Sequence, residues 1–105
     1  MLVKFSPQRN DNKLKYVFTG KTATVTLSGD GISTKMDTFD FSTLQDGDEV
    51  ARNAETGQLE IETSLPLLPI LEARRENGQV IITVLKYHGA DAPEEERFLE
   101  PLEVV

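Results

Sequence analysis

At 105 residues, 38% of them hydrophobic, the chain is expected to form one domain, residues 1–105, with a single modest core. It contains no cysteine, which excludes disulfides, thiolate chemistry and zinc–thiolate sites. The 11 Lys and Arg are scattered among 18 Asp and Glu, and the net charge of −7 argues against nucleic-acid binding. No apolar run reaches membrane-spanning length, and the start of the chain soon turns polar, so neither a membrane span nor a secretory signal is expected.

The first elements along the chain are a short strand and a β-hairpin. The apolar run LVKF, Leu2–Phe5, predicts the strand. Thr22–Ser28 alternates apolar with hydroxyl residues, which is the period-2 pattern of a half-buried strand. Gly20-Lys21 before it fits a type II′ turn, and a two-residue turn fixes the register. The predicted pairs are apolar on one face: Phe18 opposite Ala23, Tyr16 opposite Val25 and Leu14 opposite Leu27.

Asp30-Gly31 predicts the next reversal of the chain, as a type I′ turn. Such a turn sets Val25 opposite Met36 and Leu27 opposite Thr34, with Thr24 facing Asp37 and Thr26 facing Lys35. Phe39 and Phe41 then fall on the outer face. A bulge near Thr38, or a strand that passes into a second sheet, would reconcile them with a core position, and the sequence leaves both alternatives open.

The middle of the chain is polar. Asp46–Gly57, DGDEVARNAETG, is the longest polar connection, and we expect it to be a mobile loop. Gln58–Thr63, QLEIET, follows it and predicts a strand with Leu59 and Ile61 on one face.

Leu71–Leu85, LEARRENGQVIITVL, admits two interpretations. Pro69 could begin a helix that Gly78 ends, but Ile70–Asn77 is barely two turns long and has no clean apolar stripe. Asn77-Gly78 is the strongest short hairpin signal, and QVIITVL is β-branched and apolar on both faces, as a buried central strand is. The hairpin is therefore favoured, with these pairs: Ala73 opposite Ile82, Glu72 opposite Thr83, Leu71 opposite Val84 and Ile70 opposite Leu85.

The C-terminal part is rich in turns and acids. Ala92–Glu96 has the composition of one helical turn, and Pro101 limits FLEPLEVV, Phe98–Val105, to an edge strand. Many short strands separated by turn signals predict an all-β, mainly antiparallel domain. We expect a sandwich or open barrel of about six to eight strands.

No side-chain pattern in the sequence assembles a catalytic site. His88 is the only histidine, and a triad would need a serine and an acid around it. The serines lie in no nucleophile motif: Ser6, Ser28, Ser33, Ser42 and Ser64. His88 beside Gly89 is therefore interpreted as a turn residue, and no catalytic residue is assigned.

The densest group of loop acids is Asp40, Asp46, Asp48 and Glu49, and DGDEV does not match a calcium loop because its glycine falls between the acids. These carboxylates, and Glu94–Arg97, are interpreted as solvated. A cleft that cleaves sugars needs aromatic walls, and the chain has no tryptophan and two tyrosines. No metal, cofactor or enzymatic activity is expected.

Several ordered blocks resemble a family of small uncharacterised proteins encoded in the tail-gene regions of bacteriophages and prophages. The blocks are FSPQRND at 5–11, TFDFS at 38–42, DG at 46–47, IETSLPLLPILEARRENGQ at 61–79, and ADAPEEERF at 90–98 followed by Pro101. The resemblance runs along nearly the whole chain. It implies a setting in a phage particle or its assembly, in the host cytoplasm or the virion, and it assigns no site residues.

Three classes of function follow for comparison. The first is a non-enzymatic tail-associated or assembly protein with protein partners, for which symmetric tails make a homo-oligomer a reasonable expectation. The second is a small acidic effector that covers a basic surface on a host protein, because charge complementarity steers such partners together. The third and weakest is a carbohydrate-binding module. Exposed edge strands invite pairing with another chain, which makes Leu2–Phe5 and Phe98–Val105 candidate contact segments. A core position of the same apolar residues is the favoured interpretation.

Overall fold

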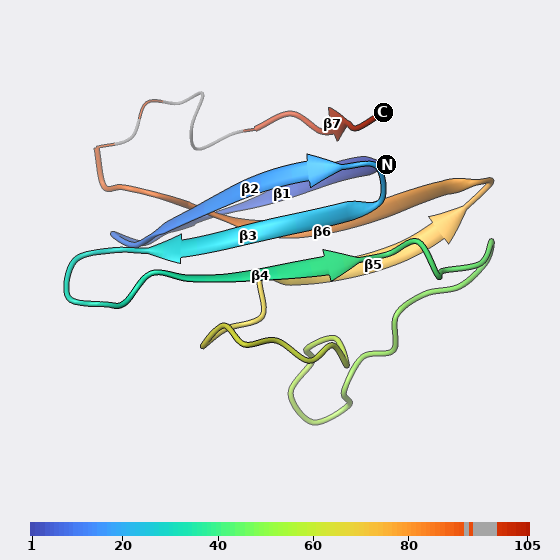
Figure 1. Cartoon of the computed structure of the whole chain (residues 1–105), viewed down its shortest axis with the longest axis horizontal. Coiled ribbons are helices and arrows are strands. Elements are labelled where there is room, and N and C mark those ends of the chain that lie inside the picture. The colour runs from blue at the N-terminus through green and yellow to red at the C-terminus, as the bar shows by residue number, and fades with distance from the viewer. Residues whose placement is uncertain (92, 94–98) are drawn as a thin grey trace.

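A computed structural model describes residues 1–91, 93 and 99–105. The described residues form seven strands in two sheets, which confirms the expected all-β, mainly antiparallel class (Figure 1). The strands are β1 (Leu2–Arg9), β2 (Lys13–Thr19), β3 (Thr22–Ser28), β4 (Lys35–Asp40), β5 (Ile70–Glu76), β6 (Gln79–His88) and β7 (Leu102–Glu103). This part of the chain has no helix long and apolar enough to cross a membrane.

The two sheets differ in how far apart their strands lie along the chain. Strands β2, β3 and β4 follow one another as a simple antiparallel meander. The other sheet has the order β5-β6-β1-β7, so the first strand lies between two of the last. There β1 runs parallel to β6, from Leu2 beside Ile81 to Arg9 beside His88, and this is the one parallel pair among the described strands.

The first hairpin confirms the predicted register. Phe18 pairs with Ala23, Tyr16 with Val25 and Leu14 with Leu27. Gly20 has φ of 60°, while Lys21 stays outside the left-handed region, as the type II′ turn requires. The alternation along β3 is therefore a true inside–outside pattern, with Ala23, Val25 and Leu27 buried.

The predicted turn at Asp30-Gly31 is wrong, and with it the register of β4. Val25 pairs with Asp37, and Ala23 pairs with Phe39. Only Gly31 of the pair has positive φ, at 76°, whereas a type I′ turn needs positive φ at both central residues. A longer connection between Ser28 and Lys35 shifts the strand by one residue. Phe39 and Phe41 thus reach the core without a bulge at Thr38.

The second hairpin has the predicted turn and no helix. Asn77 has φ of 50° and Gly78 of 78°, which is the type I′ pattern. Glu72 pairs with Thr83 and Ala73 with Ile82 as expected, but Ile70 pairs with Val84 because the ladder shifts at Leu71. The predicted pairs of Leu71 with Val84 and Ile70 with Leu85 are therefore wrong. The bulge keeps both Ile70 and Ala73 buried, which strict alternation would not allow.

The core lies between the two sheets. Fully buried side chains come from both: Leu14 and Val25 from one sheet, and Val3, Ile82 and Val84 from the other. An aromatic group completes the packing, with the rings of Phe5 and Phe18 at 6.3 Å and those of Tyr16 and Phe18 stacked at 5.5 Å. The Tyr16 hydroxyl donates to the Leu85 carbonyl and so joins β2 to β6. Burial, with Tyr87 nearby, raises the pKa of Tyr16.

The connection from residue 41 to residue 69 runs below the sheets in Figure 1 and contains no strand, so the predicted strand Gln58–Thr63 is wrong. Leu59 nevertheless packs into the core, and it forms an isolated bridge with Arg52 instead of a ladder. Leu65 is also buried. The alternation of Leu59 and Ile61 thus identified a buried residue but did not identify a strand. Mobility of Asp46–Gly57 stays a prediction.

The C-terminal end forms the short edge strand β7, which pairs Leu102 with Val3 and Glu103 with Leu2. This confirms the edge position predicted from Pro101. The helical turn predicted at Ala92–Glu96 falls on residues that, except for Pro93, lie outside the described part of the chain. Leu2–Phe5 was a candidate free edge, but β1 has β6 along one side and, at Leu2 and Val3, β7 along the other.

Asp37 fastens β4 to the connection that follows Leu59. Its Oδ2 accepts from the Thr63 hydroxyl at 2.7 Å and from the Ser64 N–H at 3.1 Å, while Oδ1 accepts from the Thr38 N–H at 2.8 Å. The bond from the Thr63 hydroxyl is the largest cause of the lowered pKa of Asp37. Desolvation acts in the opposite direction, and the bonds from the Ser64 and Thr38 amides add to the lowering.

This carboxylate predicts a specific dependence of stability on pH. A pKa that is lower in the folded state stabilises the fold above the ordinary value of 3.8, and the benefit is lost as pH falls through the folded value. The difference in free energy of unfolding between the wild type and Asp37→Asn should therefore shrink on acidification. It should stay under about 1 kcal/mol because the site is only partly buried and solvent screens the charge. Urea unfolding at neutral and acid pH measures it, Thr63→Val should reproduce part of the effect, and parallel pH profiles would contradict it.

Candidate functional site

The three-stranded sheet turns one side away from the core, and we call it the threonine face. It is made of the side chains that alternate with the buried ones: Lys13, Lys15, Val17, Thr19, Thr22, Thr24, Thr26, Ser28, Met36, Thr38 and Asp40. Thr24 and Thr38 are joined by a hydroxyl–hydroxyl hydrogen bond of 3.1 Å. Two apolar side chains stand among the threonines, Val17 with 65% of its surface exposed and Met36 with 63%.

Charge on the threonine face is confined to its rim. Lys13 and Lys15 lie on the edge strand β2, and Asp40 lies at the end of β4. The centre is the uncharged row of Thr24 and Thr26 on β3, flanked by Val17 and Lys15 on β2 and by Met36 on β4. Such a centre is cheap to desolvate because no ion has to leave water, and depletion of charge marks the core of protein interfaces. The face is thus suited to contact with another surface.

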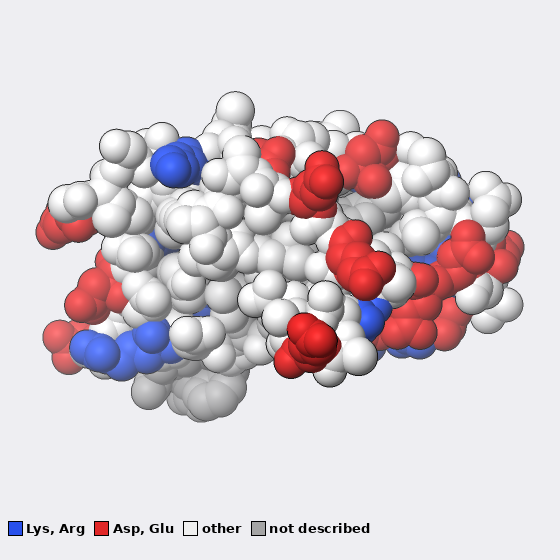
Figure 2. All heavy atoms as spheres, turned by 90° about the horizontal axis from the view of Figure 1, so that it is seen from below, with Lys and Arg blue, Asp and Glu red and all other residues white. Residues whose placement is uncertain are grey.

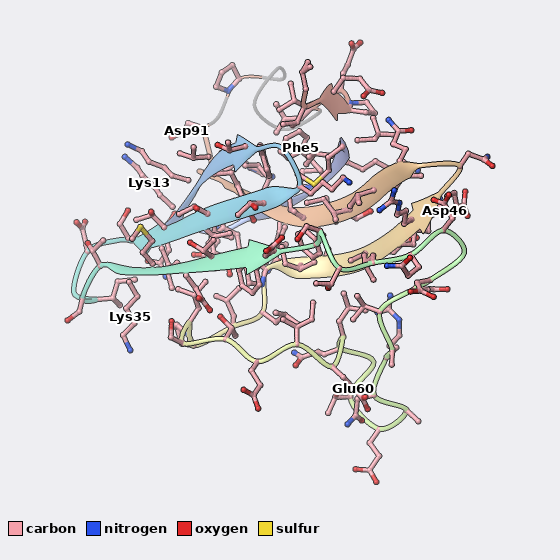
Figure 3. The ribbon with its side chains drawn as sticks, turned by 45° about the vertical axis from the view of Figure 1, so that its right-hand side comes forward. Phe5, Lys13, Lys35, Asp46, Glu60 and Asp91 are labelled. Atoms are coloured by element: carbon pink, nitrogen blue, oxygen red, sulfur yellow. The ribbon has the colours of Figure 1, made fainter. Side chains whose placement is uncertain are left out.

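A hollow of about 390 Å³ lies where β1 ends, β2 begins and β6 ends, and we call it the basic hollow. Residues 10–15, residues 86–89 and Leu99 line it. They include three lysines, Lys13, Lys15 and Lys86, together with His88. Figure 3 shows Lys13 at this end of the molecule and Asp46 at the opposite end.

Contacts on two sides shape the wall of the basic hollow. The Lys86 ammonium donates to the Leu14 carbonyl at 3.1 Å and lies 5.8 Å from the centre of the Tyr16 ring, which favours a cation. On the other side, the Asn12 N–H donates to Asn10 Oδ1 at 2.9 Å. The Asn12 side chain packs so closely on Gly29 that a Cβ at residue 29 would lie 2.2 Å from Asn12 Oδ1. Both sides are therefore held by specific contacts.

His88 lies in this wall without the partners of a triad. Its Nδ1 is 3.1 Å from the Gly89 carbonyl, which can only accept, so Nδ1 carries the proton. Within residues 1–91, 93 and 99–105, no hydrogen bond joins His88 to a serine, and no serine lines the hollow. Ser6 lies in β1, while Ser42 and Ser64 bond to other residues of β4 and its connection.

Three of the four loop acids singled out in the sequence have hydrogen-bond partners for their carboxylates, and the fourth, Glu49, is paired through its backbone. Asp46 Oδ1 accepts from Arg75 Nε at 3.1 Å and from the Gly78 N–H at 2.8 Å, which fastens the loop to the second hairpin. Asp48 accepts from the Gln45 N–H, and Asp40 accepts from the Ser42 N–H, which lowers the pKa of Asp40. Glu49 bridges to Arg74 through the backbone. Among the described residues, no group of three or more acids or histidines is placed to hold a metal ion.

These acids nevertheless gather at one end of the molecule. Figure 2 shows red side chains crowded at the end that holds the β5–β6 turn, while those over the centre of this view stand apart from one another. We call Asp46, Asp48, Glu49, Glu72 and Glu76 the acidic end. Arg74 is paired with Glu72 at 3.0 Å and with Glu76 at 2.5 Å, so it neutralises part of the charge of these two carboxylates.

Sequence reasoning named His88 but missed the lysines around it. Alternation along β2 does place Lys13 and Lys15 on the same side of that strand, and this signal was available in the sequence. Lys86 joins them only because Tyr16 and Leu14 of β2 meet the end of β6. That contact spans about seventy residues of sequence and leaves no local pattern.

Comparisons of the chain with protein-family models, with curated proteins and with solved structures found no match. The resemblance to phage tail-region proteins therefore rests on the residue blocks alone, and function has to be argued from the surfaces described above.

Proposed function

We propose that this chain is a non-enzymatic protein of a phage or prophage tail, or of its assembly, that binds another tail protein through the threonine face. One observation carries the choice of surface: Val17 and Met36 stand exposed on either side of the uncharged row of β3 in a regular sheet face. The residue blocks that resemble tail-region proteins support the setting.

The size of the face predicts weak binding by a single copy. Strands of seven residues spaced about 4.8 Å apart give a face of roughly 300 Å², whereas a stable interface covers about 800 Å² on each partner. Burying Val17 and Met36 contributes at most about 1.5–3 kcal/mol each. Several copies arranged with the symmetry of a tail would multiply this weak contact, because a second attachment becomes intramolecular.

Genome position and co-purification test the proposal in turn. The gene should lie among tail genes, and the products of those genes should co-purify with the tagged wild-type protein. The double variant Val17→Glu/Met36→Glu should lose at least about tenfold in affinity, because two carboxylates would be desolvated at the interface.

The matched control is Ala54→Glu/Gln58→Glu, which adds the same charge at exposed positions of the 41–69 connection. It should retain the partner. Equal loss in both double variants would show that only net charge matters and would remove the threonine face from the proposal. Absence of the protein from purified particles, together with no co-purifying tail protein, would refute the tail assignment itself.

The acidic end supports a second candidate, a small effector that covers a basic surface on a host protein. Its five carboxylates gather at one end of the molecule, where Arg74 and Arg75 neutralise part of their charge, and the remaining negative charge would steer a basic partner (Figure 2). The double variant Asp48→Asn/Glu49→Gln, which removes two negative charges, should weaken binding to a host partner and leave binding to a tail partner unchanged. Capture of tail proteins alone would exclude this candidate.

A further inference from the structure

We propose that the basic hollow binds a small organic phosphate, with the phosphate group held by Lys13, Lys15 and Lys86. The proposal does not need a protein bound at the threonine face, although Lys13 and Lys15 also belong to the rim of that face. It rests on a local excess of positive charge on an acidic protein. Three lysines line the hollow, and Asp11 is the one carboxylate among its lining residues in the described chain.

Lys86 is the fixed element of the site. Its ammonium has three N–H groups, one of which is used by the Leu14 carbonyl at 3.1 Å. The Tyr16 ring at 5.8 Å holds it on the other side. Two N–H groups remain for a ligand, and they are positioned before it arrives, so less side-chain entropy is lost on binding. Lysine is a common phosphate ligand in the form of such a point charge.

Lys13 and Lys15 supply the other two positive charges of the hollow. They alternate along β2 on either side of Leu14, whose carbonyl receives Lys86. The carboxylate of Asp11 opposes an anion, but Arg9 lies 3.9 Å from it and offsets part of its charge. The net charge of −7 acts mainly at long range, because salt screens charges beyond about 8–10 Å. Among the described residues that line the hollow, three lysines therefore outnumber the one carboxylate.

The volume indicates an organic phosphate in preference to the free ion. Ligand pockets measure about 300–1,000 Å³, and the hollow, at about 390 Å³, falls in that range, so inorganic phosphate would fill little of it. Tyr87 and Leu99 give the hollow an apolar side, and burial raises the pKa of Tyr87, which keeps its phenol neutral. An apolar or ring-shaped body next to the phosphate fits these walls.

Phenyl phosphate and phenol test the proposal as a pair, because they share a ring and differ in the anionic group. Titration of the full chain, followed by backbone amide NMR, should show saturable shifts at residues 10–15 and 86–89 with phenyl phosphate. Inorganic phosphate should shift the same signals more weakly. Phenol should leave them in place, and phenol binding as tight as that of phenyl phosphate would overturn the assignment.

Two double variants of equal net charge separate the site from bulk electrostatics. Lys13→Gln/Lys15→Gln should weaken phenyl phosphate binding about tenfold or more. Lys4→Gln/Lys21→Gln, with lysines on β1 and in the first turn, should change it less than about twofold. Equal weakening in both would refute a site at the hollow. Lys86→Met, checked for folding by circular dichroism, should abolish the shifts at residues 86–89, and unchanged shifts in the folded variant would also refute it.

Discussion

Replacing Phe39 by alanine should lower the free energy of unfolding by about 3–5 kcal/mol, the range found for truncation of a buried phenylalanine. Only 4% of its surface is exposed, and it pairs with Ala23, the smallest buried residue of β3. Because the neighbour is small, little can move in to fill the space that the ring leaves. Urea unfolding of the wild type and the variant, with the slope checked for two-state behaviour, measures the difference.

Met36 provides the control, since it is a large apolar residue on the same strand. It points away from the core with 63% of its surface exposed, so Met36→Ala should change stability by no more than about 0.5 kcal/mol. The type I′ turn expected at Asp30-Gly31 would put Met36 opposite Val25 and reverse the two effects. A large loss from Met36→Ala with a small loss from Phe39→Ala would therefore restore that register and contradict the observed one.

The strand register was predictable from sequence where the turn itself was decisive. Gly20-Lys21 and Asn77-Gly78 are two-residue turns, and their backbone geometry follows from a glycine in the left-handed region. Around Asp30-Gly31 the connection is longer, so the turn residues no longer determine which residues pair. The burial demand of Phe39 and Phe41 decided the register there. Their wrong parity in the predicted scheme was the sign that the turn had been misread.

The sequence patterns could not predict irregular features or contacts between residues far apart in the chain. The shift at Leu71 keeps Ile70 and Ala73 both inside, and nothing in the letters marks a bulge there. Leu59 is buried by a connection without regular structure, so alternation at Leu59 and Ile61 predicted a strand that does not form. Such segments satisfy their backbone groups through individual bonds, for example from the Glu60 N–H to the Ala51 carbonyl.

The candidate surfaces were predictable only in part. The threonine face follows directly from the alternation in β3, although its apolar members needed the corrected register of β4 to place Met36 outside. The basic hollow was not predictable, because it joins the end of β1, the start of β2 and the end of β6. No spacing rule connects Lys13 to Lys86 until the parallel pairing of β1 with β6 is known.

Replacing Val3 by aspartate should unfold most of the protein, with a loss above about 4 kcal/mol. Val3 has no exposed surface, and it pairs with Ile82 of β6 on one side and Leu102 of β7 on the other. Among the residues that the structure describes, no buried side chain is polar or charged, so an ionised carboxylate would have no partner in that core. The parallel pair would be disrupted at the strand that links β6 to β7. Far-ultraviolet circular dichroism and urea unfolding at neutral pH measure the loss.

Gln8→Asp is the control for Val3→Asp, because it adds a charge to β1 without burying it. It introduces the same charge on the same strand, at an exposed position beside Tyr87, and should cost less than about 1 kcal/mol. A stable, wild-type-like Val3→Asp variant would mean that Leu2–Phe5 is a free edge, which was the less favoured alternative from its sequence. It would then be available to pair with another chain, and the central position of β1 would be wrong.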